Sequence, residues 1–303
     1  MRNALRRGSG AAIVFLLAGC IAAPVSAPSS GAAPASVPIP QKPAAPVRPD
    51  FELAGPFIQG GVALGLAPSD ALSLALDGRP VDIAADGRFL IGFGRDATAS
   101  AELVARRADG STIRRSLTVA PRAWRIENLN RLARQSRPSV EFERLRAPEL
   151  AEINAARALV SDSQGWRQRF TWPATGRISG LFGSQRIYRG EPGAYHSGVD
   201  VARVTGTPFF APADGVVILA TNRPFTLEGY LLMIDHGMGL NSAFLHLSRI
   251  DVKPGDVVRQ GQALGAIGAT GRATGPHLHW SMKWRDERID PLLLAGPMPQ
   301  AAD

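Results

Sequence analysis

Hydrophobic residues alternate with small or polar residues over residues 51–120 of the chain. Leu72, Leu74 and Leu76 lie two positions apart, the spacing that places side chains on one face of a β-strand. Asp-Gly pairs, which favour tight hairpin turns, occur near such runs at three places: Asp77-Gly78, Asp86-Gly87 and Asp109-Gly110. The pattern predicts a small all-β, sandwich-like domain over 51–120, with either a positioning or binding role or a purely structural one.

The pattern changes over residues 121–168, where charged residues increase and glycine nearly vanishes. Pro148 and the following run Ala151–Val160 predict a helix that begins close to the proline. Four apolar residues with helical spacing would share one face: Leu150, Ile153, Ala156 and Leu159. We expect a helical linker over 121–168 that either packs on a neighbouring domain or crosses the active-site groove.

Short apolar runs separated by glycines characterise residues 169–303. Three of these runs predict buried strands: Val216–Leu219, Leu231–Ile234 and Ala243–Leu245. The glycines between them break the chain into short pieces, which is typical of a compact antiparallel-β domain. The sequence therefore predicts a mainly β chain with two β domains joined by the helical linker.

The first residues have the features of an export signal. Three arginines precede a short apolar run, Ala11–Ala18, which is far below the ~20 residues that span a bilayer. The sequence Leu17-Ala18-Gly19-Cys20 follows, and it contains the single cysteine of the chain. It resembles the bacterial lipobox, so we expect a lipoprotein signal peptide at 1–19 and lipidation of Cys20. The alternative is an ordinary secretory signal cut after Ala27.

Residues 20–50 are rich in proline, alanine and serine. Such a segment cannot bury a core, so it predicts an extended, semi-rigid tether. Anchor and tether together predict a membrane-anchored periplasmic lipoprotein of the cell envelope. The formal net charge is +8, and no basic run is interleaved with aromatic residues, so we expect no nucleic-acid partner.

All five histidines of the chain lie between positions 196 and 279. His196 and Asp200 are four residues apart, and His277 and His279 are two apart, so on strands each pair would point to one face. Imidazole and carboxylate groups are zinc ligands, and a catalytic zinc usually takes three protein groups. The spacing alone leaves open a catalytic metal, a structural metal or no metal. The sequence contains neither HExxH nor Gly-x-Ser-x-Gly.

Three motifs in order carry a closer resemblance: His196-Ser-Gly-Val-Asp200, Phe244-Leu-His246-Leu247 and Gly275-Pro-His277-Leu-His279. Together with the glycines between them, over roughly residues 170–292, they resemble the LytM/lysostaphin-type zinc metallopeptidases of the M23 family. The resemblance implies one zinc ion per chain. Its implied ligands are His196, Asp200 and His279, and its implied proton-transfer residues, beside a metal-activated water, are His246 and His277.

Some residues near the motifs have less defined roles. Phe244 stands where the family usually has tyrosine, which removes a hydroxyl group but no ligand. We expect His236 at a turn or in the wall of the groove. Tyr195 and Asn241 are further candidates for lining the substrate cleft.

The resemblance implies a zinc metalloendopeptidase that hydrolyses peptide crosslinks or stem peptides of bacterial peptidoglycan. The alternative is a non-enzymatic LytM-like regulator that binds the cell wall or activates another hydrolase. Because such regulators lose ligands and this chain has all five groups, the sequence favours the enzyme. A zinc peptidase of soluble proteins or small peptides stays open, as does any activator or division partner.

Overall fold

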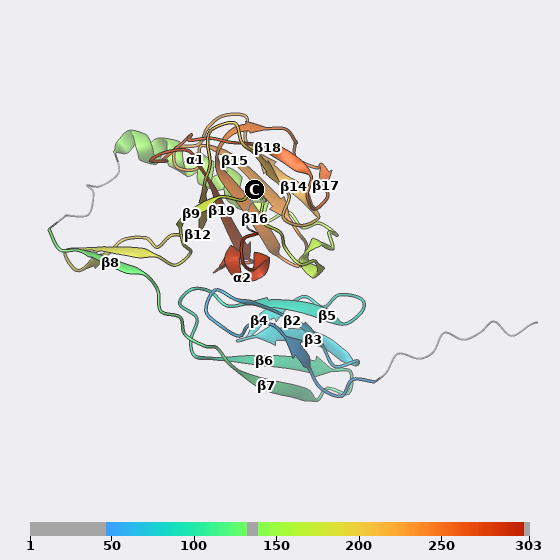
Figure 1. Ribbon diagram of the computed structural model, residues 1–303. Helices are drawn as coiled ribbons and strands as arrows, with labels where there is room; N and C mark the ends of the chain where they lie inside the picture. Colours follow the sequence, from blue (N-terminus) through green and yellow to red (C-terminus); the bar gives the residue numbers. More distant parts are fainter. Residues whose placement is uncertain (1–46, 132–138, 300–303) are drawn as a thin grey trace, which may run out of the picture. The chain divides into compact units, whose positions relative to one another are not determined.

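The computed structural model describes residues 47–131 and 139–299 (Figure 1). The predicted signal peptide, Cys20 and nearly all of the tether lie outside the described residues. Within the described part of the chain, no helix is long and apolar enough to cross a membrane. The described segments are mainly β-strands in antiparallel sheets, which confirms the predicted fold class.

Two antiparallel sheets, ordered β1-β2-β5 and β4-β3-β6-β7, form the first part of the described chain. Leu76, Phe89 and Leu103 contribute their buried side chains to the hydrophobic core, as expected for a sandwich-like arrangement. The strands are β1 Glu52–Ala54, β2 Val62–Leu66, β3 Ala71–Leu76, β4 Arg79–Val81, β5 Arg88–Gly92, β6 Ser100–Arg107 and β7 Thr112–Thr118.

The hairpin between β3 and β4 shows where the alternating pattern succeeded and where it failed. Asp77 and Gly78 have φ values of 48° and 76°, the left-handed conformation that a type I′ turn requires. Leu74 and Leu76 are buried, as predicted, but Leu72 is 72% exposed. The pairing of β3 with β6 shifts register between Ala71 and Ser73, and such a bulge turns the side chain away from the face that the alternation indicates.

The predicted helix begins earlier than the sequence analysis expected. Helix α1 spans Val140–Arg157 and contains Pro148 in its interior. Its start is defined by Ser139, whose side chain accepts a hydrogen bond from the backbone N–H of Phe142, a strong N-cap signal that the proline obscured. The residues before α1 include a strand, β8 (Ile126–Leu129), so the linker is not wholly helical.

The face of α1 that packs inward is narrower than predicted. Ile153 and Ala156 are buried, but Leu150 is 41% and Leu159 56% exposed. Leu159 lies beyond the last residue of the helix, so the helical spacing no longer applies to it. The helix therefore contacts the next domain through a small number of apolar side chains.

A ten-stranded sheet forms the centre of the domain that follows, with the path β17-β14-β15-β16-β19-β12-β9. Its three predicted buried strands lie within β14, β15 and β16, which confirms that prediction. The elements are η1 Gly165–Arg167, β9 Arg177–Gly180, β10 Gln185–Tyr188, β11 Glu191–Pro192, β12 Gly198–Ala202, β13 Pro208–Phe210, β14 Gly215–Ala220, β15 Tyr230–Asp235, β16 Leu240–Ile250, β17 Val257–Val258, β18 Ala263–Ile267, β19 His277–Trp284, β20 Glu287–Ile289 and α2 Pro291–Ala295.

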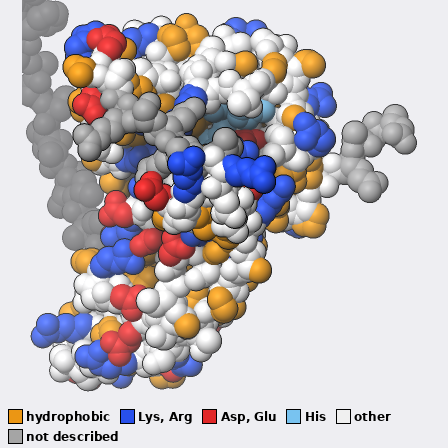
Figure 2. Space-filling view, turned by 90° about the vertical axis from the view of Figure 1, so that its left-hand side faces the viewer, with side chains coloured by type: hydrophobic (Ala, Val, Ile, Leu, Met, Phe, Trp, Pro, Cys, Tyr) orange, Lys and Arg blue, Asp and Glu red, His pale blue; other side chains and the backbone are white. Residues whose placement is uncertain are grey.

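The two faces of β19 have different chemistry. Leu278, Trp280 and Met282 point into the main hydrophobic core. The alternate positions, which include the two histidines of this strand, therefore lie on the opposite face. On that face Ile153 of α1 packs in a second cluster with Met233 and other apolar side chains of the sheet. Histidine side chains are visible in a hollow of the surface, with Lys and Arg side chains beside it (Figure 2).

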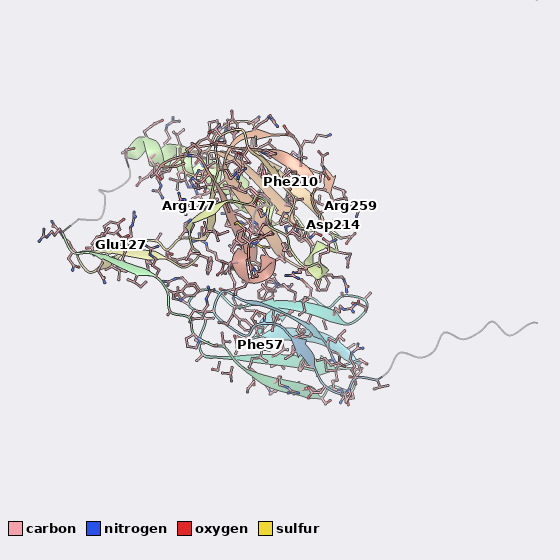
Figure 3. The ribbon with its side chains drawn as sticks, viewed as in Figure 1. Phe57, Glu127, Arg177, Phe210, Asp214 and Arg259 are labelled. Atoms are coloured by element: carbon pink, nitrogen blue, oxygen red, sulfur yellow. The ribbon has the colours of Figure 1, made fainter. Side chains whose placement is uncertain are left out.

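Asp214 secures one edge of the sheet, immediately before β14. Its carboxylate forms an ion pair with Arg259 (Nη1–Oδ2 3.0 Å), and both residues are labelled in Figure 3. The same carboxylate accepts a hydrogen bond from the backbone N–H of Gln260 at 2.8 Å. The residue before β14 is thereby tied to the loop after β17, the strand with which β14 pairs.

Candidate metal centre and active site

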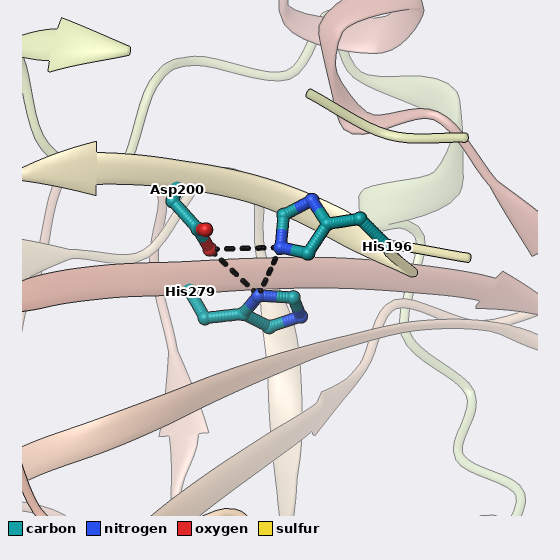
Figure 4. Close-up of side chains that lie close together, drawn as sticks. All are labelled: His196, Asp200 and His279. Atoms are coloured by element: carbon teal, nitrogen blue, oxygen red, sulfur yellow. Dashed lines mark hydrogen bonds and ion pairs between the residues drawn. The ribbon is translucent and has the colours of Figure 1, made fainter. Parts of the chain in front are cut away.

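Antiparallel pairing of β12 with β19 brings two residues 79 positions apart to the same place. Asp200 and His279 are direct partners in the register, and His196 lies four residues before Asp200, in the segment that leads into β12. The three side chains converge (Figure 4). Asp200 Oδ1 lies 2.8 Å from His279 Nδ1 and 3.0 Å from His196 Nε2, and the two nitrogens are 3.1 Å apart.

These atoms have the donor set and spacing of a metal site. They form a His/Asp/His group whose ligand atoms lie within 4.8 Å of one another. The tetrahedral arrangement around zinc, with bonds of about 2.0–2.1 Å, places ligand atoms roughly 3.3 Å apart. The observed separations are slightly shorter, so the three residues fit a metal ion with only a small outward movement of their side chains.

The hydrogen bonds around the group also favour a cation at its centre. His196 Nδ1 lies 3.1 Å from the carbonyl of Leu181, so a proton on Nδ1 leaves a lone pair on Nε2. His279 directs Nδ1 at the same point, while its Nε2 is buried and has no partner among the residues that the structure describes. Two imidazole lone pairs and one carboxylate converging on one point need a cation to balance them.

The ionisation of the group follows from the same contacts. Burial by itself would raise the pKa of Asp200, but the hydrogen bonds and charges of His196 and His279 outweigh burial and hold that pKa well below its usual range. Burial alone would lower the pKa of His196, yet Asp200 raises it. For His279 burial prevails and lowers the pKa. The carboxylate is therefore ionised at neutral pH.

Gly180 of β9 makes room for Asp200. It pairs with Asp200 across β9 and β12, and a Cβ atom at this position would lie 2.9 Å from Asp200 Cγ and 3.0 Å from Cε1 of His196. Contacts this short are repulsive, so the close approach of the two strands requires glycine. Gly180 lies outside the three motifs, so no local sequence pattern marks it as part of the site.

His246 and His277 stand beside the group with one nitrogen free. Their ring centroids are 4.8 Å apart. His246 Nδ1 donates to the carbonyl of Thr270 and His277 Nδ1 to that of Gly275, both at 2.8 Å. These bonds orient the rings and leave each Nε2 as an acceptor. His277 Nε2 lies 3.7 Å from Asp200 Oδ1.

A β-bulge decides the orientation of His246. Phe244 and Leu247 both point into the main core, whereas Leu245 packs against the second cluster on the other face. His246 has φ +63°. The pairing of β16 with β15 shifts register between Phe244 and Leu247, and its pairing with β18 shifts after Leu247, so strict alternation is interrupted. Burial, and then the charges of His277 and His279, lower the pKa of His246 to about 4, so it is neutral at pH 7.

His236 lies at the turn between β15 and β16, as one of its two expected positions had it, but it does not line a groove. Its side chain is fully buried, Nδ1 donates to the carbonyl of Asp214, and Nε2 contacts Ser242 Oγ, both at 2.8 Å. Its ring packs edge-on against Phe170. The residue follows directly after β15, and this packing places it in the core rather than in the wall of a groove.

Asn241 is buried on β16, opposite Asp235 and Lys283. It borders a cavity that Asp235 and Arg285 also line, and a cleft role for Asn241 stays a prediction. Tyr195 is half-buried, and its ring packs against Phe182 and lies 4.8 Å from the guanidinium carbon of Arg95. A cleft role for Tyr195 stays a prediction.

Comparison with known proteins agrees with this geometry. Residues 194–291, which contain all five site residues, match the model of peptidase family M23. The crystal structure of a Pseudomonas aeruginosa protein assigned to peptidase M23 is similar at 31% sequence identity and a TM-score of 0.60, covering 79% of this chain and 95% of that chain. The chain belongs to peptidase family M23. The resemblance noted in the sequence is thereby confirmed.

Curated relatives of this M23 protein share mainly the segment around the site. The peptidoglycan DD-endopeptidase ShyA of Vibrio cholerae is 38% identical over 132 residues, which is 43% of this chain and 30% of ShyA. The DD-carboxypeptidase/endopeptidase Mpg of Neisseria meningitidis is 37% identical over 128 residues, 41% of this chain and 28% of Mpg. The cell division protein DipM of Caulobacter vibrioides is 32% identical over 159 residues, 50% of this chain and 24% of DipM. The matches thus cover less than a third of each relative.

Proposed function

We propose that this M23 protein is a zinc-dependent endopeptidase that hydrolyses peptide crosslinks or stem peptides of bacterial peptidoglycan. The observation that carries the proposal is the convergence of His196 Nε2, Asp200 Oδ1 and His279 Nδ1 beside two imidazoles with free Nε2 atoms. The names of two relatives support the substrate class, since ShyA and ShyB are both peptidoglycan DD-endopeptidases.

His196, Asp200 and His279 would hold the zinc ion. When bound, zinc polarises a carbonyl group and lowers the pKa of water to roughly 7. The protein's own contribution is a set of ligands whose orientation is fixed before binding. Leu181 orients His196 through its carbonyl, and the space left by Gly180 positions Asp200.

His246 and His277 would transfer the protons of the reaction. A neutral Nε2 accepts a proton from the attacking water while the carbonyl carbon forms its new C–O bond. The C–N bond then breaks, and the leaving amine nitrogen takes a proton from an imidazolium, so the products are a carboxylate and an amine. Both imidazoles are held by backbone carbonyls, which keeps Nε2 directed at the reacting group.

A non-enzymatic regulator of another hydrolase is the competing function. The match to DipM, a cell division protein, is the finding closest to this idea. Such a regulator needs no convergent ligands, whereas this chain holds three ligand atoms within hydrogen-bonding distance of one another. The geometry therefore favours the enzyme.

The experiment that tests the proposal combines metal analysis with digestion of purified sacculi. We expect one zinc per chain and release of peptides whose masses identify the bond. His196→Ala should lose metal and activity, whereas His277→Ala should lose activity and keep most of the metal. Intact sacculi after incubation with the zinc-loaded protein would reject the enzyme, and equal metal loss in both variants would reject the division of roles.

The proposed location is the periplasmic side of the cell envelope, with the domain tethered to a membrane by acyl chains on Cys20. The support is the lipobox-like Leu17-Ala18-Gly19-Cys20 and the proline-rich residues 20–50. Two or more acyl chains hold a protein stably on a bilayer. A Cys20→Ala variant should move from the membrane fraction to the soluble fraction, and unchanged membrane retention would contradict the anchor.

A further inference from the structure

The sheet face that carries the metal centre continues into a small cavity beneath α1. Its volume is about 130 Å³, space for about four water molecules at roughly 30 Å³ each. Ser197 and Ser281 border the cavity, one and two residues in sequence from His196 and His279. Residues of α1, including Ile153, close it on the side away from the sheet.

The lining of this cavity is strongly cationic. Its charged residues are Arg146, Arg157, Lys283, Arg288 and Glu228. Both carboxylate oxygens of Glu228 already accept hydrogen bonds from Arg146, at 2.6 and 2.7 Å. Among the described residues, the other three cations have no ion-pair partner within 4.0 Å.

Two of these unpaired cations are desolvated, which makes their lack of a partner costly. The Nε atom of Arg157 is buried and has no hydrogen-bond partner in the part of the chain that the structure describes. Burial, and then the charge of Arg288, lower the pKa of Arg157. Burial, and then the charge of Arg157, lower the pKa of Lys283, against the opposing charges of Asp286 and Glu287. An anion in the cavity would relieve this repulsion.

The three cations without an ion-pair partner do not hold α1 in place. That role belongs to Arg146, through Glu228, and to Glu149, whose carboxylate accepts hydrogen bonds from Thr226 at 2.6 and 2.7 Å. Within residues 47–131 and 139–299, Arg157, Lys283 and Arg288 form no ion pair with an opposing element. Their convergence on one cavity therefore has a different explanation.

Spacing along β19 relates the cavity to the reaction. Lys283 lies four residues after His279 and on the same face of the strand, a distance of about 13 Å at roughly 3.3 Å per residue. An extended peptide advances by a similar distance per residue. A group held near Ser281 or Lys283 would therefore lie two to four residues from the bond at the metal centre.

We propose that the cavity is a substrate subsite that binds a carboxylate group of the peptide, two to four residues from the bond that is cut. The inference rests on the proposed function, since it assigns a feature of the same substrate. The guanidinium of Arg157 and the ammonium of Lys283 bind the carboxylate, and Arg288 adds its charge from the more exposed side. Peptides without this carboxylate, or with it amidated, bind more weakly.

Binding of two kinds of probe tests the subsite. The first is a synthetic crosslinked stem-peptide dimer with free carboxylates. The second is a series of such dimers, each with one carboxylate amidated. Dissociation constants are measured by calorimetry on the zinc-loaded full chain carrying His277→Ala, which stops turnover. We expect amidation at one position to weaken binding at least tenfold, the size of a charge-assisted hydrogen bond.

Variants show whether the cavity is responsible. Lys283→Met should weaken binding of the free-carboxylate dimer at least tenfold. Its affinity for the dimer whose amidation weakens binding to the parent should stay unchanged. Lys283→Arg should again bind the free dimer more tightly than that amidated dimer. Arg157→Met should repeat the effect if Lys283→Met fails to fold. The matched control is Lys253→Met, at an ammonium group 83% exposed in a distant loop. Equal affinity of Lys283→Met and the parent for both probes would overturn the proposal.

The proposed function is tested separately, by digestion of sacculi with the unmodified protein. If sacculi stay intact but the dimers are discriminated through Lys283, the subsite stands and the hydrolase fails. If sacculi are cut but every amidated dimer binds like the free one, the hydrolase stands and the subsite is rejected. Absence of measurable binding to the free dimer also rejects the subsite.

Discussion

Substitution of Gly180 tests whether the strand pairing, rather than the ligands alone, creates the metal site. The backbone of Gly180 does not have a positive φ, so alanine can adopt its conformation without backbone strain. The added Cβ would lie 2.9 Å from Asp200 Cγ and 3.0 Å from His196 Cε1. Non-bonded carbon atoms prefer about 3.5–4.0 Å, so one or both ligands must move by roughly 0.5–1 Å.

That displacement is large compared with the tolerance of a metal site, about 0.2 Å in each bond. We therefore expect Gly180→Ala to weaken zinc binding at least 100-fold, which is about 2.7 kcal/mol. The weaker binding should also appear in the free energy of unfolding. At zinc concentrations far above either Kd, added zinc should raise the unfolding free energy of wild type by about 2.7 kcal/mol more than that of the variant.

The assay is chelator competition for the zinc Kd, with urea unfolding in the presence and absence of zinc. Gly275→Ala is the matched control, because a Cβ there meets no atom within 4 Å, and its zinc Kd should stay within a factor of three of the wild-type value. If Gly180→Ala binds zinc as tightly as Gly275→Ala, the ligands relax around the methyl group, and the steric argument is refuted.

Two further predictions concern stability. Arg146→Met breaks the ion pair with Glu228, in which the two side chains are only 15% and 14% exposed, and should reduce the free energy of unfolding in urea titrations by about 3 kcal/mol. Arg144→Met, at an ion pair whose side chains are 67% and 62% exposed, should reduce it by less than about 0.5 kcal/mol. Equal losses in the two variants would contradict the effect of burial. Burial lowers the pKa of His236 to about 4 in the folded protein. Above about pH 6.5 the imidazole is neutral in both the folded and the unfolded state, so burying it costs no deprotonation. As the pH falls toward 4, only the unfolded state takes up a proton, and the free energy of unfolding decreases. Between pH 7 and 4.5 wild type should lose roughly 2 kcal/mol more unfolding free energy than His236→Asn, and parallel pH profiles would show that His236 is not buried neutral.

Much of the fold and most of the candidate site were accessible from local sequence patterns. Short continuous apolar runs predicted β14, β15 and β16, because a strand that is covered on both faces carries apolar side chains at successive positions. The period of two predicted a shared face for His277 and His279, which both lie on β19. The same expectation for His196 and Asp200 rested on a strand that begins only at Gly198, so their convergence depends on the segment before β12. The start of α1 was also encoded locally, by Ser139 as N-cap, but Pro148 masked that signal in the sequence.

Other features depended on contacts between distant segments. The bulge at His246 turns its ring out of the core, against the alternation of β16, because pairing with β15 and β18 shifts register there. Gly180 and Asp200 are 20 residues apart, and only the pairing of β9 with β12 shows why glycine is required.

The sequence by itself therefore determined the β architecture, which rests on spacings within single strands, and the identity of the candidate ligands, which rests on the resemblance of three ordered motifs to the M23 family. Only the tertiary structure placed His236 in the core and brought Arg157 of α1 to Lys283 of β19 in one cavity. Burial and desolvation arise from neighbours that are remote in sequence, so a histidine at a strand end or an arginine at a helix end carries no local sign of its environment.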